Sequence, residues 1–82
     1  MNEIEIQLAY PIATNGIITK SLKVRRPTVG DSLVADSLPG SDLEKEAYLM
    51  ASLCQISPED IKKMDLIDYE KIKDALVKKK GD

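Results

Sequence analysis

Hydrophobic and polar residues alternate along residues 3–10, near the start of the chain. The apolar residues on one face are Ile4, Ile6, Leu8 and Tyr10, and the residues between them are mostly polar. A repeat of two over eight residues predicts a half-buried β-strand. We expect Pro11 to end this strand, because proline has no N–H group to donate to a neighbouring strand.

A second strand is predicted over residues 17–24, where Leu22 and Val24 share a face. The dipeptide Asn15-Gly16 precedes it and favours a tight turn. Lys20 interrupts the apolar face, which indicates a bulge or a switch of face. The two strands form an antiparallel hairpin over about residues 3–24, and a lone hairpin is marginal in water, so it must pack against something.

The rest of the chain is punctuated by helix-start signals. Four times, a short oxygen-bearing side chain stands three residues before a carboxylate; the pairs are Thr28 and Asp31, Ser41 and Glu44, Ser57 and Asp60, and Asp65 and Asp68. Such pairs cap the free N–H groups at a helix start. The predicted helices cover about 29–38, 42–55, 58–64 and 66–79, and Pro39-Gly40 ends the first of them.

These helices are amphipathic. Apolar residues recur at helical spacing in the second helix, at Leu43, Ala47, Met50, Ala51 and Cys54 with Leu49 and Leu53 beside them, and in the last helix at Tyr69, Ile72, Ala75 and Leu76. In the first helix we expect Leu33 and Leu38 to face the core. The predicted fold class is α+β: one domain over 1–82, with an N-terminal antiparallel β-hairpin, three to four short amphipathic helices within about 28–79, and a basic tail at 78–82.

Composition narrows the range of possible functions. The 82 residues include no Trp and no Phe, so the core must be aliphatic. The single cysteine, Cys54, cannot form an internal disulfide and is expected to be a buried apolar residue, which fits a reducing cytoplasm. Histidine is absent, which excludes Ser-His-Asp and Cys-His catalysis and makes a zinc site implausible. We expect no enzyme activity and no catalytic, cofactor-binding or metal-binding residues.

Charge and hydropathy give two further expectations about partners. The formal net charge is −2, with acidic and basic residues mixed along the chain. Nucleic-acid binding is therefore not expected, because it relies on a concentration of positive charge. A membrane partner is not expected either, because no apolar run approaches the ~20 residues that cross a bilayer.

The tripeptide Asp-Ser-Leu occurs twice, at 31–33 and at 36–38. It is also the sequence at which acyl carrier proteins accept their prosthetic group, so Ser37 is a candidate attachment point. However, carrier chemistry needs an exposed serine at the start of a long helix, and Pro39-Gly40 breaks any helix that begins at Ser37. The structural interpretation, a short capped helix, is favoured, and a carrier domain modified on Ser37 is kept as an alternative function.

Arg25 and Arg26 lie where the hairpin meets the first helix. One interpretation is a contact with an anion or a carboxylate of a partner. The other is an internal ion pair with Glu3, Glu5 or Asp31. The sequence leaves both open.

The order of these features resembles a known family. A hairpin with a glycine turn leads into LKVRRPTVGD (residues 22–31), followed by a helix with an acidic start and by LCQISPEDIKKMDLIDYEKIKDAL (residues 53–76). This order is similar to that of the short tail assembly chaperones of Mu-like contractile-tailed phages and prophages, which are encoded next to the tape measure protein. The resemblance covers nearly the whole chain and is densest over 22–31 and 53–69.

The resemblance implies a function that composition does not show. Such proteins bind the tape measure protein, a long, helical, aggregation-prone chain, and keep it soluble until tail tube subunits polymerise around it. It implies action in the cytoplasm of the bacterial host and absence from the mature virion. A frameshifted longer form, if the gene encodes one at Lys78-Lys79-Lys80, is expected to reach the tail tube protein.

A helix bound in an apolar surface strip is the expected mode of recognition. The candidate partner-binding residues are Leu49, Leu53, Ile56, Ile67 and Tyr69, insofar as the core does not use them, together with Arg25 and Arg26. The outer edge of the hairpin is a second candidate surface, and pairing there would produce a homo-oligomer. A small protein–protein adaptor remains a further alternative function.

Overall fold

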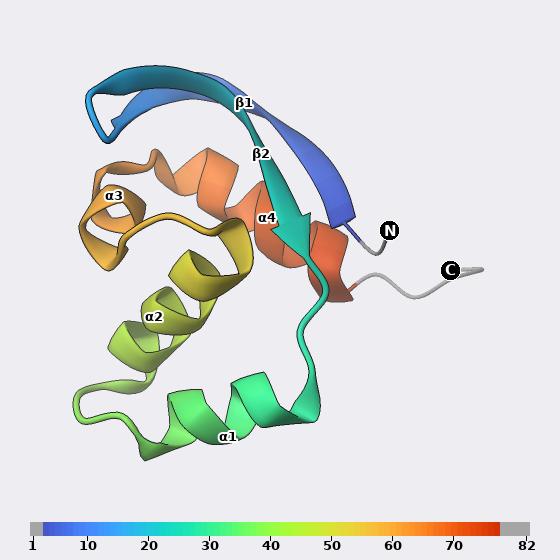
Figure 1. Cartoon of the computed structure of the whole chain (residues 1–82), viewed down its shortest axis with the longest axis vertical. Coiled ribbons are helices and arrows are strands. Elements are labelled where there is room, and N and C mark those ends of the chain that lie inside the picture. Colours follow the sequence, from blue (N-terminus) through green and yellow to red (C-terminus); the bar gives the residue numbers. More distant parts are fainter. Residues whose placement is uncertain (1–2, 78–82) are drawn as a thin grey trace.

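A long β-hairpin and four helices make up residues 3–77, the part of the chain that the computed structural model describes (Figure 1). The elements in chain order are β1 (Glu3–Thr14), β2 (Ile17–Arg25), α1 (Val29–Ser37), α2 (Asp42–Cys54), α3 (Pro58–Lys63) and α4 (Leu66–Val77). The predicted α+β class, with an antiparallel hairpin before short helices, is confirmed. The predicted basic tail, 78–82, lies outside the described residues.

The hairpin turns at Asn15 and Gly16, as predicted. Both residues have positive φ, at 53° and 79°, and Thr14 pairs with Ile17 across the turn. Positive φ at both central positions matches the right-handed twist of the flanking strands. Asparagine tolerates this conformation and glycine adopts it without a steric penalty.

The predicted end of β1 at Pro11 is wrong. The strand continues to Thr14 and contains a bulge, in which the register jumps from the pair Gln7–Ser21 to the pair Ile12–Thr19. Residues 8–11 therefore lie opposite Lys20 alone. The sequence signal at Lys20 marked a real irregularity, but the extra residues are on β1. Proline is tolerated inside this strand because the bulge frees it from donating a hydrogen bond.

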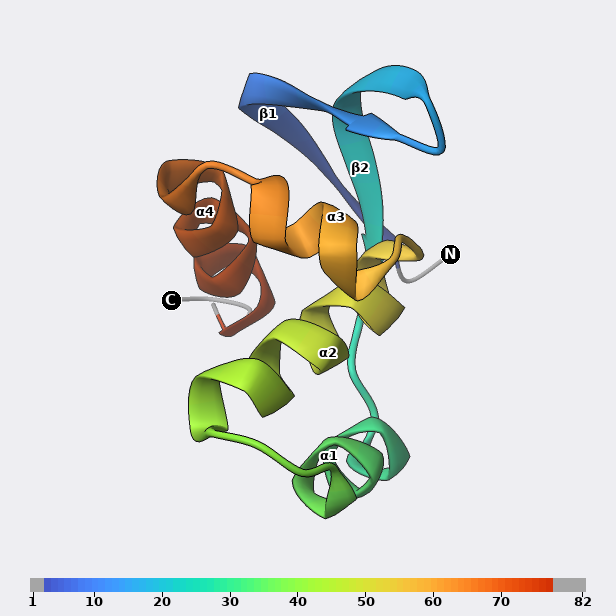
Figure 2. The same cartoon turned by 90° about the vertical axis from the view of Figure 1, so that its left-hand side faces the viewer.

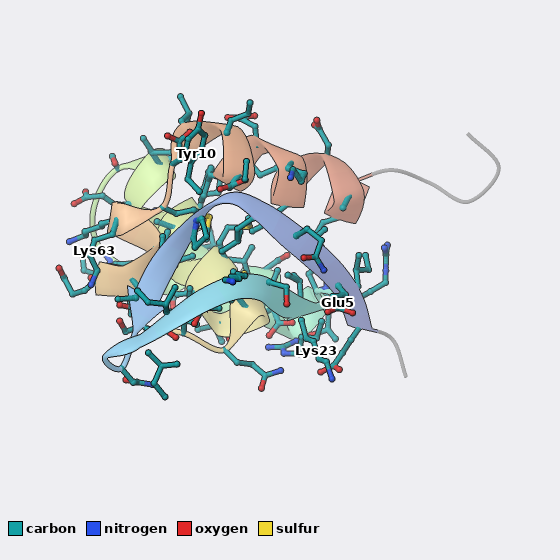
Figure 3. The ribbon with its side chains drawn as sticks, turned by 90° about the horizontal axis from the view of Figure 1, so that it is seen from above. Glu5, Tyr10, Lys23 and Lys63 are labelled. Carbon is teal, nitrogen blue, oxygen red and sulfur yellow. The ribbon has the colours of Figure 1, made fainter. Side chains whose placement is uncertain are left out.

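The bulge also moves Tyr10 off the buried face to which the alternation assigned it. Leu8, at the start of the bulge, and Ile12, just after it, are buried, whereas Tyr10 is 58% exposed. Figure 3, which looks down on the hairpin, shows Tyr10 beside α4 and places Glu5 and Lys23, which are paired in the register, on neighbouring strands.

A buried carboxylate on α4 holds the bulge in place. Asp68 is fully buried, and its two oxygens accept hydrogen bonds from the backbone N–H groups of Ala9, at 2.8 Å, and Tyr10, at 3.0 Å. Lys71 lies 3.7 Å from the same carboxylate and donates to the carbonyl oxygen of Gln7 at 2.7 Å. The bulge thus directs two N–H groups to the carboxylate. These hydrogen bonds offset part of the free energy that burying the carboxylate costs.

This contact corrects the predicted role of Asp68 as the second half of a capping box. Asp65 does cap α4, because its side chain accepts from the N–H of Ile67 at 2.9 Å. The other three starts are as predicted in position. Complete capping boxes form at Thr28 with Asp31 and at Ser41 with Glu44, and Ser57 caps α3 with Pro58 in its first turn.

The core lies between the concave face of the hairpin and helices α2, α3 and α4 (Figures 1 and 2). Its buried residues are Ile6, Leu8, Ile12, Leu22, Val24, Met50, Ala51, Leu53, Cys54, Ile61, Met64, Tyr69 and Ile72. Residues on α1 do not belong to this cluster. Helix α1 lies at the far end of the molecule from the hairpin tip and packs on α2.

The prediction that Leu33 faces the core is therefore wrong. Leu33 is 66% exposed, and the one buried residue of α1 is Ala35. Leu33 lies two positions before Ala35, and at 3.6 residues per turn this places it on the side of α1 turned away from α2. Leu38, just after the helix, is half-buried.

Candidate functional site

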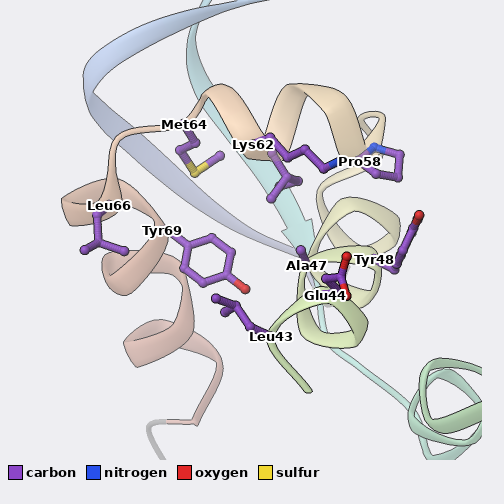
Figure 4. A pocket seen from close by; sticks show the side chains of 10 residues that line it. Leu43, Glu44, Ala47, Tyr48, Pro58, Lys62, Met64, Leu66 and Tyr69 are labelled. Carbon is purple, nitrogen blue, oxygen red and sulfur yellow. The ribbon is translucent and has the colours of Figure 1, made fainter. Parts of the chain in front are cut away.

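An apolar groove runs between α2, α3 and α4 (Figure 4). Its volume is about 340 Å³, and it is lined by Leu43, Glu44, Ala47, Tyr48, Pro58, Ile61, Lys62, Met64, Leu66 and Tyr69. Eight of these ten side chains are apolar or aromatic. A groove of this kind accepts apolar side chains of a partner, because filling it removes apolar surface from water.

The opening of the groove is formed by residues in the first turns of α2 and α4. Leu43 lies in the first turn of α2, just after the Ser41 cap, and Leu66 is the first residue of α4. The two side chains are 65% and 69% exposed although both are aliphatic. The groove therefore presents aliphatic surface at its mouth as well as in its floor.

Tyr69 forms part of the floor and is fixed by Glu46. Its hydroxyl donates to the Glu46 carboxylate at 2.8 Å, and the Lys73 ammonium lies 3.1 Å from the same carboxylate. Burial, followed by the hydrogen bond to Glu46, raises the pKa of Tyr69 well above its usual range. The phenol therefore stays protonated and keeps its ring oriented toward the groove.

The lining of the groove is mostly apolar and includes two charged side chains. The charged residues that line it are Glu44 and Lys62. Hydrogen bonds from Ser41, first from its backbone N–H, lower the pKa of Glu44, so this group stays ionised as a helix cap. Among residues 3–77, no cluster of histidine, cysteine, aspartate or glutamate side chains is arranged to hold a metal ion.

The comparison with protein families covers almost the whole chain. Residues 5–78 match the profile of the family described as "Phage tail assembly chaperone proteins, E, or 41 or 14". The chain belongs to the phage tail assembly chaperone family. No curated protein and no solved structure gives a significant match. Within the described residues, no helix is both long enough and apolar enough to cross a membrane.

The predicted partner-binding residues of this chaperone do not form one exposed strip. Leu53 and Tyr69 are core residues, 1% and 7% exposed. Leu49 and Ile56 are half-buried against the core. Of the five aliphatic and aromatic candidates, Ile67 is well exposed, at 58%.

Arg25 forms an internal ion pair, the second of the two roles that the sequence left open. Its guanidinium donates to both carboxylate oxygens of Asp31, at 2.7 and 2.9 Å, and reaches Ser52 at 3.3 Å. The ion pair ties the end of β2 to the first turn of α1. Arg26 is exposed and lines a shallow hollow beside Glu3 and Pro27.

Three groove residues were missed as surface candidates. Leu43 was assigned to the buried stripe of α2, but the first turn of that helix projects beyond the core. Tyr48 and Leu66 were not singled out. The sequence did contain a clue: the apolar stripe of α2 begins in the first turn of the helix, at Leu43. An apolar residue so close to a helix end can extend past the element on which the helix packs.

The structure also shows where Cys54 and Ser37 lie, the two remaining residues singled out from the sequence. Cys54 is buried in the core, as predicted, and burial raises the pKa of its thiol to about 11. Ser37 is the last residue of α1, and its hydroxyl donates to the Val34 carbonyl at 2.7 Å. A carrier serine needs to stand at the start of a long helix, and Ser37 stands at the end of a short one.

Proposed function

We propose that this chain binds the tape measure protein of a Mu-like phage or prophage and keeps it soluble during tail assembly. The observation that carries the proposal is the groove between α2, α3 and α4, which exposes Leu43 and Leu66 in a protein of the tail assembly chaperone family. Contiguous exposed apolar surface on a small soluble domain is typical of an interaction site.

The groove suits a helical client. An amphipathic helix places aliphatic side chains at positions i, i+3, i+4 and i+7, and laying this stripe into an apolar groove is a recurring mode of peptide recognition. A long helical chain that aggregates through such stripes would be protected while copies of the chaperone cover them. In this proposal the chaperone acts by binding alone and catalyses no reaction.

The wider setting is part of the same proposal. The chaperone acts in the cytoplasm of the bacterial host and leaves before the virion is complete, and nucleic acids and membranes are not its partners. A longer form made by frameshifting would contact the tail tube protein, and self-association would bring several copies to one client. Lys78-Lys79-Lys80, where the frameshift was expected, lies outside the described residues.

Co-expression with the tape measure protein encoded next to this gene tests the proposal. The client is expected to be insoluble alone and to co-purify with the chaperone. Substituting Leu43→Glu and Leu66→Glu together should lower the soluble fraction of the client severalfold, because two charges then stand at the mouth of the groove.

The hairpin tip offers a matched control. Ile17 and Ile18 are 69% and 65% exposed, nearly the same values as Leu66 and Leu43. Ile17→Glu with Ile18→Glu adds the same two charges on a different surface and should leave the client soluble. If the client instead becomes insoluble only with the Ile17→Glu and Ile18→Glu variant, the client-binding surface lies on the hairpin. A client that stays insoluble with the unaltered chaperone would overturn the proposed function.

A further inference from the structure

The two strands of the hairpin differ in what lies beside them. On β1, the N–H groups of Ala9 and Tyr10 donate to Asp68 of α4, and Lys71 of the same helix donates to the Gln7 carbonyl oxygen. On β2, no hydrogen bond within the described chain joins the backbone to any element other than β1. Figure 3 shows β1 between α4 and β2. We call the side of β2 turned away from β1 the open edge.

An open strand edge is a site at which a further strand can pair. Its outward N–H and C=O groups, which alternate along the strand, have no partner in the sheet. An extended chain that adds itself as a third strand satisfies these groups, a recurring mode of recognition called β-augmentation. The open edge therefore suits an extended segment, whereas the groove between α2, α3 and α4 suits a helix.

Basic side chains surround the open edge. Residues 17–26 include four basic residues and no acidic one, although the net charge of the chain is −2. Arg25 forms the internal ion pair described above. The other three, Lys20, Lys23 and Arg26, are exposed and form no ion pair within the described residues. The fold thus leaves three positive charges at or next to an unpaired strand.

These charges disfavour a second copy of the chain as the occupant. Antiparallel pairing of β2 with β2 of another copy would bring the lysines of both strands together, and like charges on neighbouring strands are destabilising. The other strand, β1, does carry acidic residues, but its backbone between Gln7 and Tyr10 is already bonded to α4. A different chain with acidic residues fits the open edge better.

The strand that β2 already pairs with indicates the chemistry of this different chain. Strand β1 begins with the sequence EIEI, in which acidic and aliphatic residues alternate. The register places Glu3 opposite Arg25. In the same way, Glu5 lies opposite Lys23. A strand of similar composition on the other side of β2 would meet the same basic residues, and opposite charges on neighbouring strands are stabilising.

We propose that the open edge of β2 binds an extended segment of a partner protein in which acidic and aliphatic residues alternate. The backbone of the segment pairs with β2, and its carboxylates lie beside Lys20, Lys23 and Arg26. A hollow of about 580 Å³ just after β2, lined in part by Arg26 and Thr28, leaves room for the end of the segment. This site is separate from the groove and goes beyond the proposed binding of a helical client.

Three synthetic peptides provide the probe. Each is about eight residues long, within the usual range of a strand. The first alternates glutamate with valine, the second has lysine in place of glutamate, and the third is the glutamate peptide with N-methyl groups throughout its backbone. NMR titration of the ¹⁵N-labelled chain gives the Kd of each peptide and the residues that it contacts.

The glutamate peptide is expected to bind at least about tenfold more tightly than the lysine peptide at low salt, because like charges repel at the edge. Added salt should weaken its binding, because the side chains involved are exposed. The N-methylated peptide should not bind, because it has no N–H groups to donate to β2.

Hydrogen exchange tests whether the backbone takes part. With the glutamate peptide bound, amide protons at every second residue of β2 should exchange more slowly, because an added strand pairs with alternate residues. Attraction between charges alone would not produce this alternation.

Lys23→Glu and Lys45→Glu are a matched pair of variants. Both change the net charge equally, but Lys23 lies on β2 and Lys45 lies on α2. Lys23→Glu should weaken binding of the glutamate peptide about fivefold, the effect of exchanging one exposed attraction for a repulsion. Lys45→Glu should leave its Kd within about twofold at ~0.1 M salt, where distant charges are screened. Lys20→Glu together with Lys23→Glu should bind the lysine peptide more tightly than the glutamate peptide, and this gain shows that the variant is folded.

The outcomes separate this inference from the proposed function. Equal binding of the glutamate and lysine peptides, or no slowed exchange on β2, overturns the inference even if the chaperone solubilises the tape measure protein. Slow exchange on β2 without any peptide, with a dimer in sedimentation, would assign the edge to a second copy and also overturn it. Conversely, if the glutamate peptide pairs with β2 but the client stays insoluble, the edge site stands and the proposed function fails.

Discussion

Helices α4 and α1 depart from the hydrophobic pattern in opposite ways. Helix α4 buries a charged residue, Asp68, together with Ile72, and both are 0% exposed. Helix α1 exposes aliphatic residues, Val29, Leu33 and Val34, at 78%, 66% and 63%. One region places polarity inside and the other leaves apolar surface outside.

The difference lies in whether the exception has a partner within the chain. The Asp68 carboxylate meets two N–H groups of the β1 bulge, so its burial is compensated by charge-assisted hydrogen bonds. No such compensation exists for the apolar residues of α1 within the described chain, since α1 packs on α2 through Ala35 and its neighbours and is joined to β2 by the Arg25–Asp31 ion pair. A buried polar residue with a partner inside the chain, such as Asp68, has a structural role. Exposed apolar residues without such a partner, as on α1, are where we expect a second molecule to bind.

Truncating one aliphatic residue on each helix should separate the two regions most clearly. Ile72→Ala removes buried volume from the core and should lower the free energy of unfolding by about 2–5 kcal/mol. Leu33→Ala removes exposed surface and should change it by less than about 0.5 kcal/mol. Urea unfolding followed by circular dichroism measures both, and equal losses would show that α1 belongs to the cooperative core.

Asp68→Asn tests the polar contact with the same shape in place. An amide keeps one acceptor for Ala9 or Tyr10, but its NH₂ group turns toward the other N–H and leaves that donor unpaired. The expected loss is about 1–3 kcal/mol, the cost of one unsatisfied buried group. Asp36→Asn on α1 is the control, because Asp36 is exposed and should tolerate the change. A stable Asp68→Asn variant would mean that the bulge does not depend on the carboxylate.

The ion pair that attaches α1 to the hairpin should give a smaller, pH-dependent effect. Hydrogen bonds from Arg25, followed by the Thr28 N–H, hold the pKa of Asp31 well below its usual range. Because the folded-state pKa is depressed, the contact contributes its full stability above the unfolded pKa of ~3.9 and loses that stability progressively as pH falls from this value through the lower, folded pKa. Stability from this pair is therefore constant near neutral pH.

Titration of the Asp31 carboxyl carbon by NMR measures this directly. Arg25→Gln should raise the pKa of Asp31 toward its usual value, although the Thr28 N–H keeps it somewhat low. Arg26→Gln removes the neighbouring charge without breaking the pair and should leave the titration close to that of the unaltered chain. If Arg26→Gln has the larger effect, general charge rather than the bidentate pair controls Asp31.

The same contrast between local and distant partners explains what the sequence could predict. Helix starts were predicted within a residue because capping joins groups three positions apart, as in Thr28 with Asp31. The turn at Asn15 and Gly16 is equally local. Tyr10 and Pro11 were misplaced because the bulge depends on Asp68, which lies 58 positions after Tyr10, and no local pattern reports that contact.

The candidate site was harder to predict than the fold for a similar reason. Periodicity identifies the apolar face of α2, but it does not say where the neighbouring elements end. Leu53 and Tyr69 were taken up by the core, whereas Leu43, on the same stripe as Met50, extends past it. Which apolar residue stays exposed is decided by the lengths of α3 and α4 and the angles at which they pack.

Thiol reactivity offers a comparison of the two regions that leaves stability nearly unchanged. Cys54 is buried in the core and burial raises its pKa to about 11, so both access and thiolate formation are suppressed. Leu33→Cys adds a second thiol on the exposed side of α1. At pH 8 a disulfide reagent should modify one thiol of this variant at once and the other only as the core opens. Adding urea should accelerate the slow reaction alone, because that reaction depends on global unfolding rather than on local motion of α1. Two fast reactions would instead mean that the aliphatic core opens as readily as the surface of α1.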